Sequence, residues 1–531
     1  MKKKAAILLL GMTLIFSGCS SNSNSDNTSS EQSGSSSTTN SETAQNVSTG
    51  SVTTTEGIDV DLTGDYSDKA LDASYDEADA TIITLNGTDI EVEGDGASVS
   101  DQVVTITEKG TYIVSGTLED GQIVVDLTED KNVQLVLDNA DITCSDNAAI
   151  LVKSVKNLYL TLADGSENTV TDGSEYVLED EEDNTNAAIF SKDDLIINGN
   201  GSLTVNANYN DGITSKDDLK IISGTITVNA KDDAIIGKDS ISIKDGTLNL
   251  TAGGDAIKSS NTEDTTKGYV VIDGGTINIS AGDDGVHSET VLVINNVDMN
   301  ISQSVEGLES LNIIINDGTI KLKASDDGVN IAGGNDSTST DQPMGGGGMD
   351  EAIDGALVIN GGTLDVDAGG DGLDSNGSIL MTGGTVTASG PTDAGNGVLD
   401  YNGTFEITGG VLLATGISGM NQAPSDSSSQ ISFAVTSDST IAAGSEVTVK
   451  DADGNVLYTF TAEKESNYIV ISAPDLEDGA SYTIEADGQT MEATGGDISA
   501  AESGMGGGGG GGMQRPQNQQ DGNQSGQTKK M

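Results

Sequence analysis

Acidic residues recur at a nearly constant spacing through the middle of the chain, and carboxylates in such a pattern are candidate metal ligands. Each acid opens a tripeptide that continues with Gly or Ala and then an aliphatic residue. Four intervals between successive acids are 22, 22, 22 and 21 residues, a period typical of solenoid proteins. The acids that open these tripeptides are Asp211, Asp233, Asp255, Asp284, Glu306, Asp327 and Asp371.

Two intervals in this series are longer than the others. The interval 255→284 exceeds the period by seven residues, and we expect the polar stretch 259–267 to form a surface loop there. The interval 327→371 equals two periods of 22 residues and contains a Gly/Met-rich insertion at 345–349. The repeat therefore continues through both irregularities.

A second series of Gly-Thr dipeptides keeps step with the acids. Between these markers each period holds two or three apolar alternations of four to six residues, which are typical of short β-strands. One period then forms one coil of a parallel β-helix, and successive coils stack about 4.8 Å apart. We expect the Asp-Gly turns to need positive φ or tight corners. The second series starts at Gly224, Gly246, Gly275, Gly318, Gly362 and Gly384.

Solenoid stacking would place acids that are one period apart about 5 Å from each other. Two like charges at that distance repel by about 1 kcal/mol in water and about 3 kcal/mol at an effective dielectric of 20. Raised carboxyl pKa values would relieve part of this repulsion, and calcium, which accepts six to eight oxygen ligands, would relieve more. Turn capping by Asp side chains is the alternative for each single acid. The predicted calcium ligands are Asp211, Asp232, Asp233, Asp255, Asp283, Asp284, Glu306, Asp326, Asp327 and Asp371.

A row of alternating charge runs beside the acids, at 191–194, 215–218 and 238–239. Because each Lys is followed by one or two Asp residues, we interpret this row as a self-neutralising surface ladder rather than a metal site.

The ends of the chain differ in composition from the repeat. Residues 1–19 form a predicted lipoprotein signal peptide, with lysines, an apolar run and Ser17-Gly18-Cys19, so Cys19 is the predicted lipidation site. The Ser/Thr-rich linker 20–56 and the Gly/Gln-rich tail 497–531 are predicted to be disordered. Residues 57–430 form the predicted right-handed parallel β-helix, and 431–496 a small β-sandwich-like module.

Composition limits the classes of partner. A formal net charge of −62 disfavours nucleic acid and anionic lipid headgroups, so we expect membrane contact only through the lipid anchor. The two cysteines are too few for a disulfide framework. We expect Cys144 to be unpaired and buried as a small apolar residue.

The sequence does not favour catalysis. The one arginine, Arg515, lies in the tail, and the one histidine, His287, is interpreted as a surface residue without a role. A lysine base such as Lys216, Lys238 or Lys258, acting with calcium, is the alternative that would make the protein a uronan lyase. No Ser/His/Asp set, CxxC pair or P-loop is present.

Several segments resemble a family of bacterial exported carbohydrate-binding lipoproteins, exemplified by a clostridial cellulose- and pectin-binding, pectate-lyase-like β-helix. The resemblance covers roughly residues 73–496 and implies a β-helix with bound calcium that binds plant cell-wall polysaccharide, including acidic sugars. The resemblance does not identify which residues of this chain contact sugar. The segments that carry it are 120–125, 133–137, 186–195, 210–213, 215–221 and 268–276.

The plausible sugar-stacking rings are Tyr209, Tyr269 and Tyr401, each with a purely structural role as the alternative. Lys216 and Lys238 are the candidate lysine contacts to sugar. The function predicted is an exported, calcium-stabilised polysaccharide binder without catalysis. A lyase with a lysine base and a structural stalk or adhesin are the alternatives.

Overall fold

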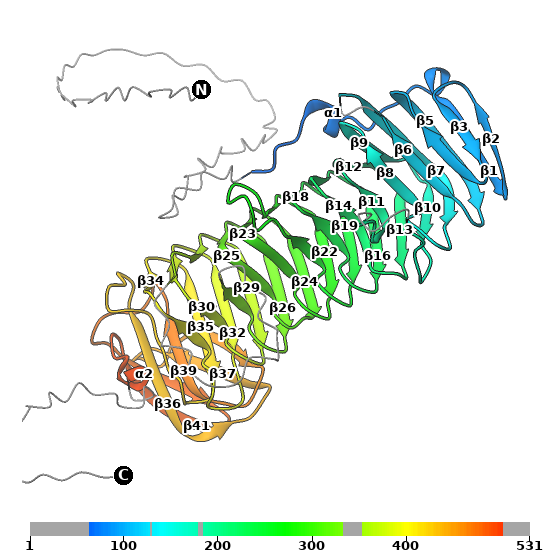
Figure 1. Ribbon diagram of the computed structural model, residues 1–531. Coiled ribbons are helices and arrows are strands. Elements are labelled where there is room, and N and C mark those ends of the chain that lie inside the picture. The colour runs from blue at the N-terminus through cyan, green and yellow to red at the C-terminus, as the bar shows by residue number, and fades with distance from the viewer. Residues whose placement is uncertain (1–62, 128–129, 179–183, 333–352, 503–531) are drawn as a thin grey trace, which may run out of the picture. The chain divides into compact units, whose positions relative to one another are not determined.

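A computed structural model describes residues 63–127, 130–178, 184–332 and 353–502, and these are almost entirely β-structure (Figure 1). The predicted signal peptide with Cys19, the linker, most of the tail with Arg515, and the Gly/Met-rich insertion lie outside the described residues. The helical segments are short: α1 (Asp68–Leu71), η1 (Glu77–Asp79) and α2 (Ser499–Glu502). No helix among the described residues is long and apolar enough to cross a membrane.

The strands stack coil upon coil in three parallel ladders, and β23 and β25 each contribute to the first and the second ladder. The first ladder contains β4 (Val103–Ile106), β6 (Gln122–Asp126), β8 (Ile150–Ser154), β11 (Ala187–Ser191), β14 (Asp211–Ser215), β17 (Ile235–Gly237), β20 (Ile257–Ser259), β23 (Val286–Ile294), β25 (Leu308–Ile315), β27 (Val329–Ile331), β30 (Leu373–Ser375) and β33 (Leu399–Tyr401). The second contains β1 (Thr81–Gly87), β5 (Gly110–Leu118), β7 (Asn132–Thr143), β9 (Asn157–Leu162), β12 (Asp194–Gly199), β15 (Asp218–Ile221), β18 (Ser240–Ile243), β21 (Tyr269–Ile272), β28 (Ala356–Ile359), β31 (Ser378–Met381) and β34 (Phe405–Ile407). The third contains β10 (Glu167–Thr171), β13 (Ser202–Ala207), β16 (Thr225–Ala230), β19 (Thr247–Thr251), β22 (Thr276–Ser280), β24 (Asp298–Gln303), β26 (Thr319–Ala324), β29 (Thr363–Ala368), β32 (Thr385–Ser389) and β35 (Val411–Gly416).

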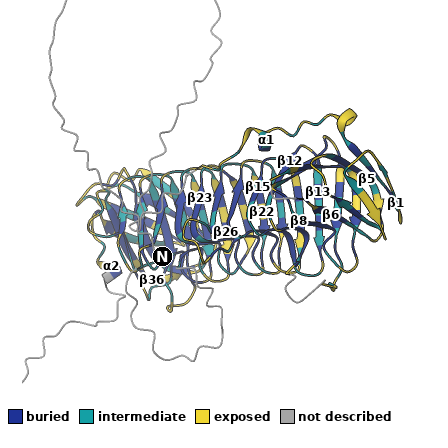
Figure 2. Cartoon of the chain, turned by 45° about the horizontal axis from the view of Figure 1, so that its top comes forward, coloured by how far each residue is buried: buried dark blue, intermediate teal, exposed yellow. Residues whose placement is uncertain are grey.

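Aliphatic columns form the interior of this stack. Ile213, Ile235 and Ile257 are in register on successive coils of the first ladder and are fully buried. Figure 2 shows buried positions recurring along the strands in coil after coil. Branched side chains pack well on such pleated surfaces, which explains how a chain with 3% aromatic residues builds a long core.

The glycines of the two repeat series have different physical roles. The expectation of positive φ at the Asp-Gly turns is wrong, because positive φ occurs instead in the Gly-Thr series, as at Gly224 (113°) and Gly246 (122°). At Gly285 a Cβ atom would lie 2.5 Å from the carbonyl oxygen of Gly307 on the next coil. The Asp-Gly glycine therefore permits a close approach between coils.

The solenoid has antiparallel additions at both ends. Near its start β1 pairs with β2 (Asp89–Glu93), and β3 (Ala97–Ser100) pairs with β4. At its end β39 pairs with both β35 and β36, so the last coil continues into the C-terminal module. A second sheet has the order β38-β37-β40-β41 and shares an apolar cluster with β36 and β39. The module strands are β36 (Ser432–Ile441), β37 (Ser445–Lys450), β38 (Val456–Ala462), β39 (Ser466–Ser472), β40 (Ser481–Ala486) and β41 (Gln489–Thr494).

The structure agrees with the prediction of an all-β chain with a long, mainly parallel stack of coils. The right-handed sense, the full closure of the coil and the division into domains stay predictions. The expectation for Cys144 is confirmed, since its thiol is free and buried, and burial raises its pKa to about 11.

Candidate functional site

Seven acids of the repeat form one continuous row, here called the acid column: Asp211, Asp233, Asp255, Asp284, Glu306, Asp327 and Asp371. The residue after each acid donates a backbone hydrogen bond to the carbonyl oxygen of the acid on the next coil. Gly212 N, for example, lies 2.9 Å from Asp233 O, and Gly328 N lies 2.9 Å from Asp371 O. Residues about 22 positions apart are therefore direct neighbours, as the repeat predicts.

Carboxylates of the acid column also cap the following coil. Asp233 Oδ1 accepts the backbone N–H of Asp255 at 2.7 Å, and Asp255 Oδ1 accepts that of Asp284 at 2.8 Å. Asp327 Oδ1 accepts the N–H of Asp371 at 2.6 Å. The turn-capping alternative is thus realised for these three acids, but each cap uses one oxygen of the carboxylate and does not neutralise its negative charge.

Burial makes this charge unfavourable. Desolvation is the largest cause in each case, with nearby carboxylates adding to it, and the pKa of Asp211 is raised to about 7, of Asp233 to about 6 and of Glu306 to about 7. The pKa of Asp327 is likewise raised to about 6 and that of Asp371 to about 7. A partner that neutralises the column would therefore stabilise the fold.

A second row lies beside the acids, at the third position after each of them. After Asp211 and Asp233 this position holds the uncharged Thr214 and Ile236. The members that follow are here called the partner column: Lys258, His287, Glu309, Asn330 and Asp374, with Asp400 one coil later. Its members are paired in register from coil to coil. The chemistry of this column changes along the solenoid, because its first two members carry nitrogen and its last two carry carboxylate.

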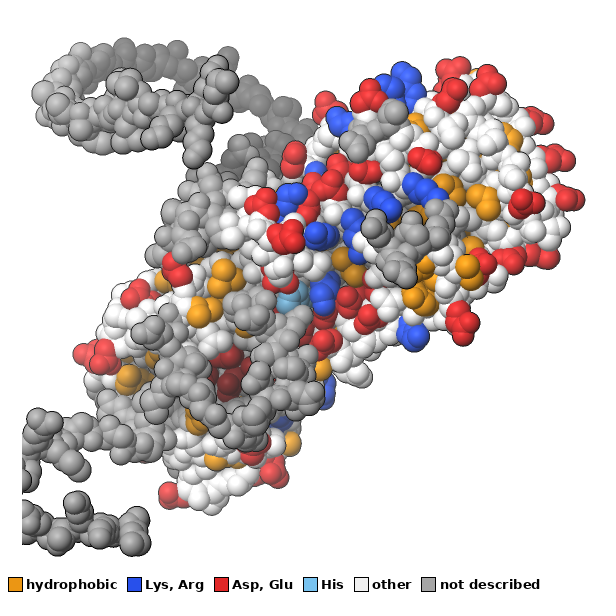
Figure 3. Space-filling model, viewed as in Figure 1, with side chains coloured by type: hydrophobic (Ala, Val, Ile, Leu, Met, Phe, Trp, Pro, Cys, Tyr) orange, Lys and Arg blue, Asp and Glu red, His pale blue; other side chains and the backbone are white. Residues whose placement is uncertain are grey.

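Beside Asp255 the partner column supplies a cation. Lys258 Nζ lies 2.5 Å from Asp255 Oδ2 and 3.8 Å from Asp233 Oδ2. On the face shown in Figure 3, most of the blue lysine side chains lie on the N-terminal side of the pale blue histidine. The charge of Asp233 and Asp255 is therefore offset within the protein.

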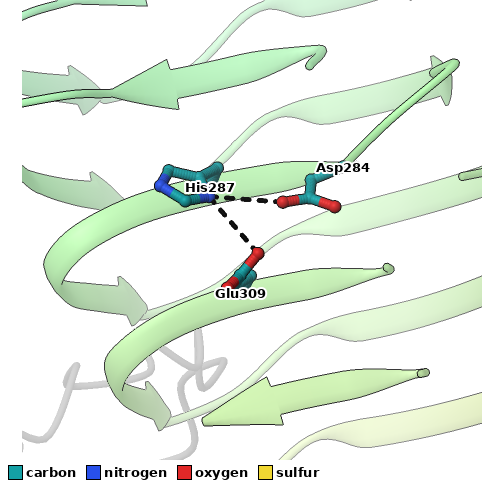
Figure 4. Close-up of side chains that lie close together, drawn as sticks. All are labelled: Asp284, His287 and Glu309. Carbon is teal, nitrogen blue, oxygen red and sulfur yellow. Dashed lines mark hydrogen bonds and ion pairs between the residues drawn. The ribbon is translucent and has the colours of Figure 1, made fainter. Parts of the chain in front are cut away.

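His287 is the next member, and the prediction that it lies on the surface is wrong. Its side chain is 1% exposed, with Nδ1 3.2 Å from Asp284 Oδ2 and 3.5 Å from Glu309 Oε2 (Figure 4). Its Nε2 lies 3.7 Å from Glu289 Oε1. Burial opposes the imidazolium charge, but these carboxylates outweigh it and raise the pKa of His287 to about 12. Burial raises the pKa of Asp284 to about 8.

In the C-terminal half the partner column adds further acids. Oxygens of Asp327, Asp371 and Asp374 lie within 4.8 Å of one another, and no lysine or histidine forms an ion pair with them among the described residues. Burial, followed by repulsion from Asp327, Asp371 and Asp400, raises the pKa of Asp374 to about 8. Of the two oxygen-only groups among the described residues, this is the one that has no lysine within ion-pair distance, and it is here called the oxygen-only cluster.

The absence of a side chain at Gly370 leaves space beside this cluster. A Cβ atom at Gly370 would collide with Oδ1 of Asp326 and Oδ1 of Asp327, so both carboxylates project over the next coil. Gly254 has the same relation to Asp232 and Asp233. The oxygen donors and the space fit a hard cation such as calcium.

Three predicted ligands directly precede members of the acid column, and they lie at its edge. Asp232 and Asp326 are exposed and Asp283 is partly exposed. Carboxylate oxygens of Asp255, Asp283 and Asp284 also lie within 4.8 Å of one another. Since Lys258 already binds Asp255, this group differs from the oxygen-only cluster.

The row of alternating charge is neutralised only in part by its own lysines. Asp239 binds Lys267, which comes from the loop before β21. Lys216 lies with Nζ 5.4 Å from the centre of the Phe190 ring, and burial lowers its pKa. Asp217 faces Asp239 and its pKa is raised to about 7 through the hydrogen bond between them. No described metal cluster occurs in this row.

The candidate sugar-contacting residues are scattered. Tyr209 stacks on Tyr176, with ring centres 4.1 Å apart. Tyr269 packs against an aliphatic cluster of the second ladder, and the Tyr401 hydroxyl donates to Ala423 O at 2.7 Å. Lys238 is partly exposed on the segment after β17. The structure does not bring these residues together, and their sugar contacts stay predictions.

The sequence interpretation missed Asp374, Glu309 and Asp400. The available signal was the third position after each repeated acid, which the solenoid places next to the acid column. The prediction names the acids of the tripeptides and the acids directly before three of them, Asp232, Asp283 and Asp326, but no acid at the third position after them.

Comparisons with known proteins identify the family. A family described as "Carbohydrate-binding domain-containing protein" matches residues 100–349. A protein of the same description from Acetivibrio thermocellus is 50% identical over 209 residues, which are 39% of this chain and 73% of that protein. The chain belongs to this family of carbohydrate-binding domain-containing proteins. The family match ends before Asp371, Asp374 and the C-terminal module.

A solved structure is also similar to this member of the family. It is described as the polysaccharide lyase-like protein from C. thermocellum, in a gadolinium derivative, and is 40% identical. The likeness covers 48% of this chain and 93% of that one, with a TM-score of 0.40.

Proposed function

We propose that this protein is an extracellular, calcium-stabilised binder of plant cell-wall polysaccharide, either cellulose or acidic uronans, and that it performs no catalysis. Membership of the carbohydrate-binding domain family supports the sugar partner. The observation that carries the calcium part is the partly buried oxygen-only cluster of Asp327, Asp371 and Asp374, with raised carboxyl pKa values and no lysine or histidine ion pair among the described residues.

Calcium would also allow this negatively charged protein to bind a negatively charged sugar. A chain with a net charge of −62 repels a polyuronate. A calcium ion held by the cluster keeps coordination positions for further oxygens, since it takes six to eight, and uronate carboxylates are suitable oxygen ligands. The ion thus joins two negatively charged surfaces.

The test is a pull-down of the full chain on insoluble cellulose and on polygalacturonate, each with calcium and with chelator. We expect calcium-dependent retention on polygalacturonate, which the Asp371→Asn/Asp374→Asn variant loses. The matched control is Asp365→Asn, because Asp365 lies on the third ladder and pairs with Lys321 at 3.3 Å. Equal retention of both variants, or retention in chelator, contradicts calcium bridging. Binding to neither material contradicts the sugar proposal.

A calcium-dependent uronan lyase with a lysine base is the second candidate. The observation in its favour is Lys216, since burial lowers its pKa toward the range of a general base. Lys258 is less suitable because it is held by Asp255. Growth of the unsaturated-uronate absorbance, lost in Lys216→Met, would establish this activity. A stalk or adhesin, the remaining alternative, predicts binding to neither sugar.

The extracellular location rests on the predicted signal peptide. Lipidation at Cys19 predicts that the chain is recovered with membranes and that Cys19→Ala releases it. Membrane recovery of the Cys19→Ala variant contradicts the anchor.

A further inference from the structure

His287 and two carboxylates form a buried group that differs in chemistry from the oxygen-only cluster. The donors are His287 Nδ1 on β23, Asp284 Oδ2 just before β23, and Glu309 Oε2 on β25 of the next coil (Figure 4). Their side chains are 1%, 4% and 5% exposed. The group is therefore held by two successive coils and is almost fully buried.

The distances within this group fit metal ligands better than they fit a hydrogen bond. Nδ1 faces two carboxylate oxygens, at 3.2 and 3.5 Å, although a single ring N–H donates only one strong bond. Charge-assisted N–H···O bonds are about 2.7–2.9 Å long. Ligands at about 2.1 Å in a tetrahedron around zinc lie about 3.4 Å from one another. The two distances from Nδ1 match the second geometry, and all three donors lie within 4.8 Å of one another.

An unpartnered oxygen in the same group points to a ligand independently. Asp284 is 3% exposed, and its Oδ1 has no hydrogen-bond partner among the described residues. A buried carboxylate oxygen without a partner is costly. Oδ1 points away from His287 and Glu309 (Figure 4), but a metal ion on Oδ2 would lower this cost by neutralising the charge that the two oxygens share.

The surroundings of the imidazole support the same assignment. Glu289 Oε1 lies 3.7 Å from Nε2, on the side of the ring away from Asp284 and Glu309. A shift of less than about 1 Å would bring this carboxylate to the hydrogen-bond distance at which such a group holds a ligating histidine in the correct tautomer. The neutral ring with one aspartate and one glutamate also balances the charge of a divalent ion.

We propose that Asp284, His287 and Glu309 form a site for a borderline divalent transition-metal ion of the zinc class, separate from the calcium cluster. Imidazole nitrogen favours such an ion over calcium, which prefers oxygen ligands. Binding displaces the imidazole proton to solvent and leaves a fourth position for water. The inference does not depend on the proposed sugar binding.

The single histidine of the chain makes a direct test possible. The full chain is labelled with ¹⁵N-histidine, stripped of metal, saturated with calcium to fill oxygen-only sites, and titrated with zinc chloride at pH 8. We expect the Nδ1 resonance to shift with one equivalent of zinc while Nε2 stays protonated. If both ring nitrogens stay protonated at saturating zinc, the proposal is overturned.

Variants separate this site from the calcium cluster in thermal unfolding. We expect Glu309→Gln to lose the zinc-induced rise in Tm and keep the calcium-induced rise, and Asp371→Asn/Asp374→Asn to do the reverse. Glu289→Gln should weaken zinc binding about 10- to 100-fold. A zinc-induced rise that survives in Glu309→Gln overturns the site. A zinc response without any calcium response contradicts the proposed calcium cluster alone.

Discussion

The two halves of the acid column use the same backbone geometry but neutralise their charge differently. Around Asp255 the third residue after the acid is Lys258, which binds two acids of the column. Around Asp371 the third residue is Asp374, which adds negative charge. The repeat therefore determines where carboxylates accumulate, whereas one variable position determines whether the protein itself supplies a cation beside them.

The largest expected effect concerns the half with its own cation. Lys258→Met should lower the free energy of unfolding by about 3 kcal/mol, because it leaves a buried carboxylate uncompensated. Urea unfolding in chelator measures this loss. The control is Lys321→Met, whose 66% exposed side chain pairs with Asp365 and should contribute less than about 1 kcal/mol. Equal losses in both variants would remove the distinction between the two halves.

Calcium should act on the other half. A ligand at 100 times its dissociation constant stabilises a fold by about 2.7 kcal/mol, so we expect chelation to lower the Tm of the wild-type protein by several degrees. Asp371→Asn/Asp374→Asn should show no such change, while Asp365→Asn should behave as the wild type. Scanning calorimetry of the three proteins with and without chelator measures this change in Tm. A wild-type Tm that is indifferent to chelation contradicts the calcium cluster.

Without metal, Asp371→Asn/Asp374→Asn should make the protein more stable than the wild type. In chelator it removes repulsion between desolvated carboxylates, so its free energy of unfolding should exceed that of the wild type by about 1 kcal/mol. The capping bond from Gly397 N to Asp371 Oδ1, 2.5 Å long, can be accepted by an Asn amide oxygen as well. Denaturant unfolding provides the comparison, and a lower stability in chelator would speak for a structural role of the two acids instead.

The pattern of aliphatic residues and acids was sufficient to predict the stack and the neighbour relation of Asp233 and Asp255. The sequence did not reveal Asp374, because its role depends on lying beside the acid column rather than on any local motif. His287 occupies an outward-facing strand position, which favours exposure in an isolated sheet. Glu309 and Glu289 lie against it, however, and bury it. Burial of outward side chains depends on neighbours from other coils.

The smallest effect is the pH dependence of the metal-free protein. The pKa values of Asp371 and Asp374 are raised to about 7 and about 8, from about 3.9 in unfolded chains. The folded state thus binds more protons between about pH 4 and pH 8, and the stability this contributes is lost as the pH rises through 7 and 8. In chelator the Tm should fall from pH 5 to 8.5, less steeply for Asp371→Asn/Asp374→Asn. If the Tm of the wild type and of the double variant depended equally on pH, the raised pKa values of Asp371 and Asp374 would be contradicted.

The most direct test of the contrast between the halves is a calorimetric titration of metal-stripped full-length protein with calcium. The wild type and Asp233→Asn should show the same tight binding event, and Asp371→Asn/Asp374→Asn should lose it or weaken it at least tenfold. Calcium binding by the double variant that equals the wild type, or no binding by the wild type, would contradict the account.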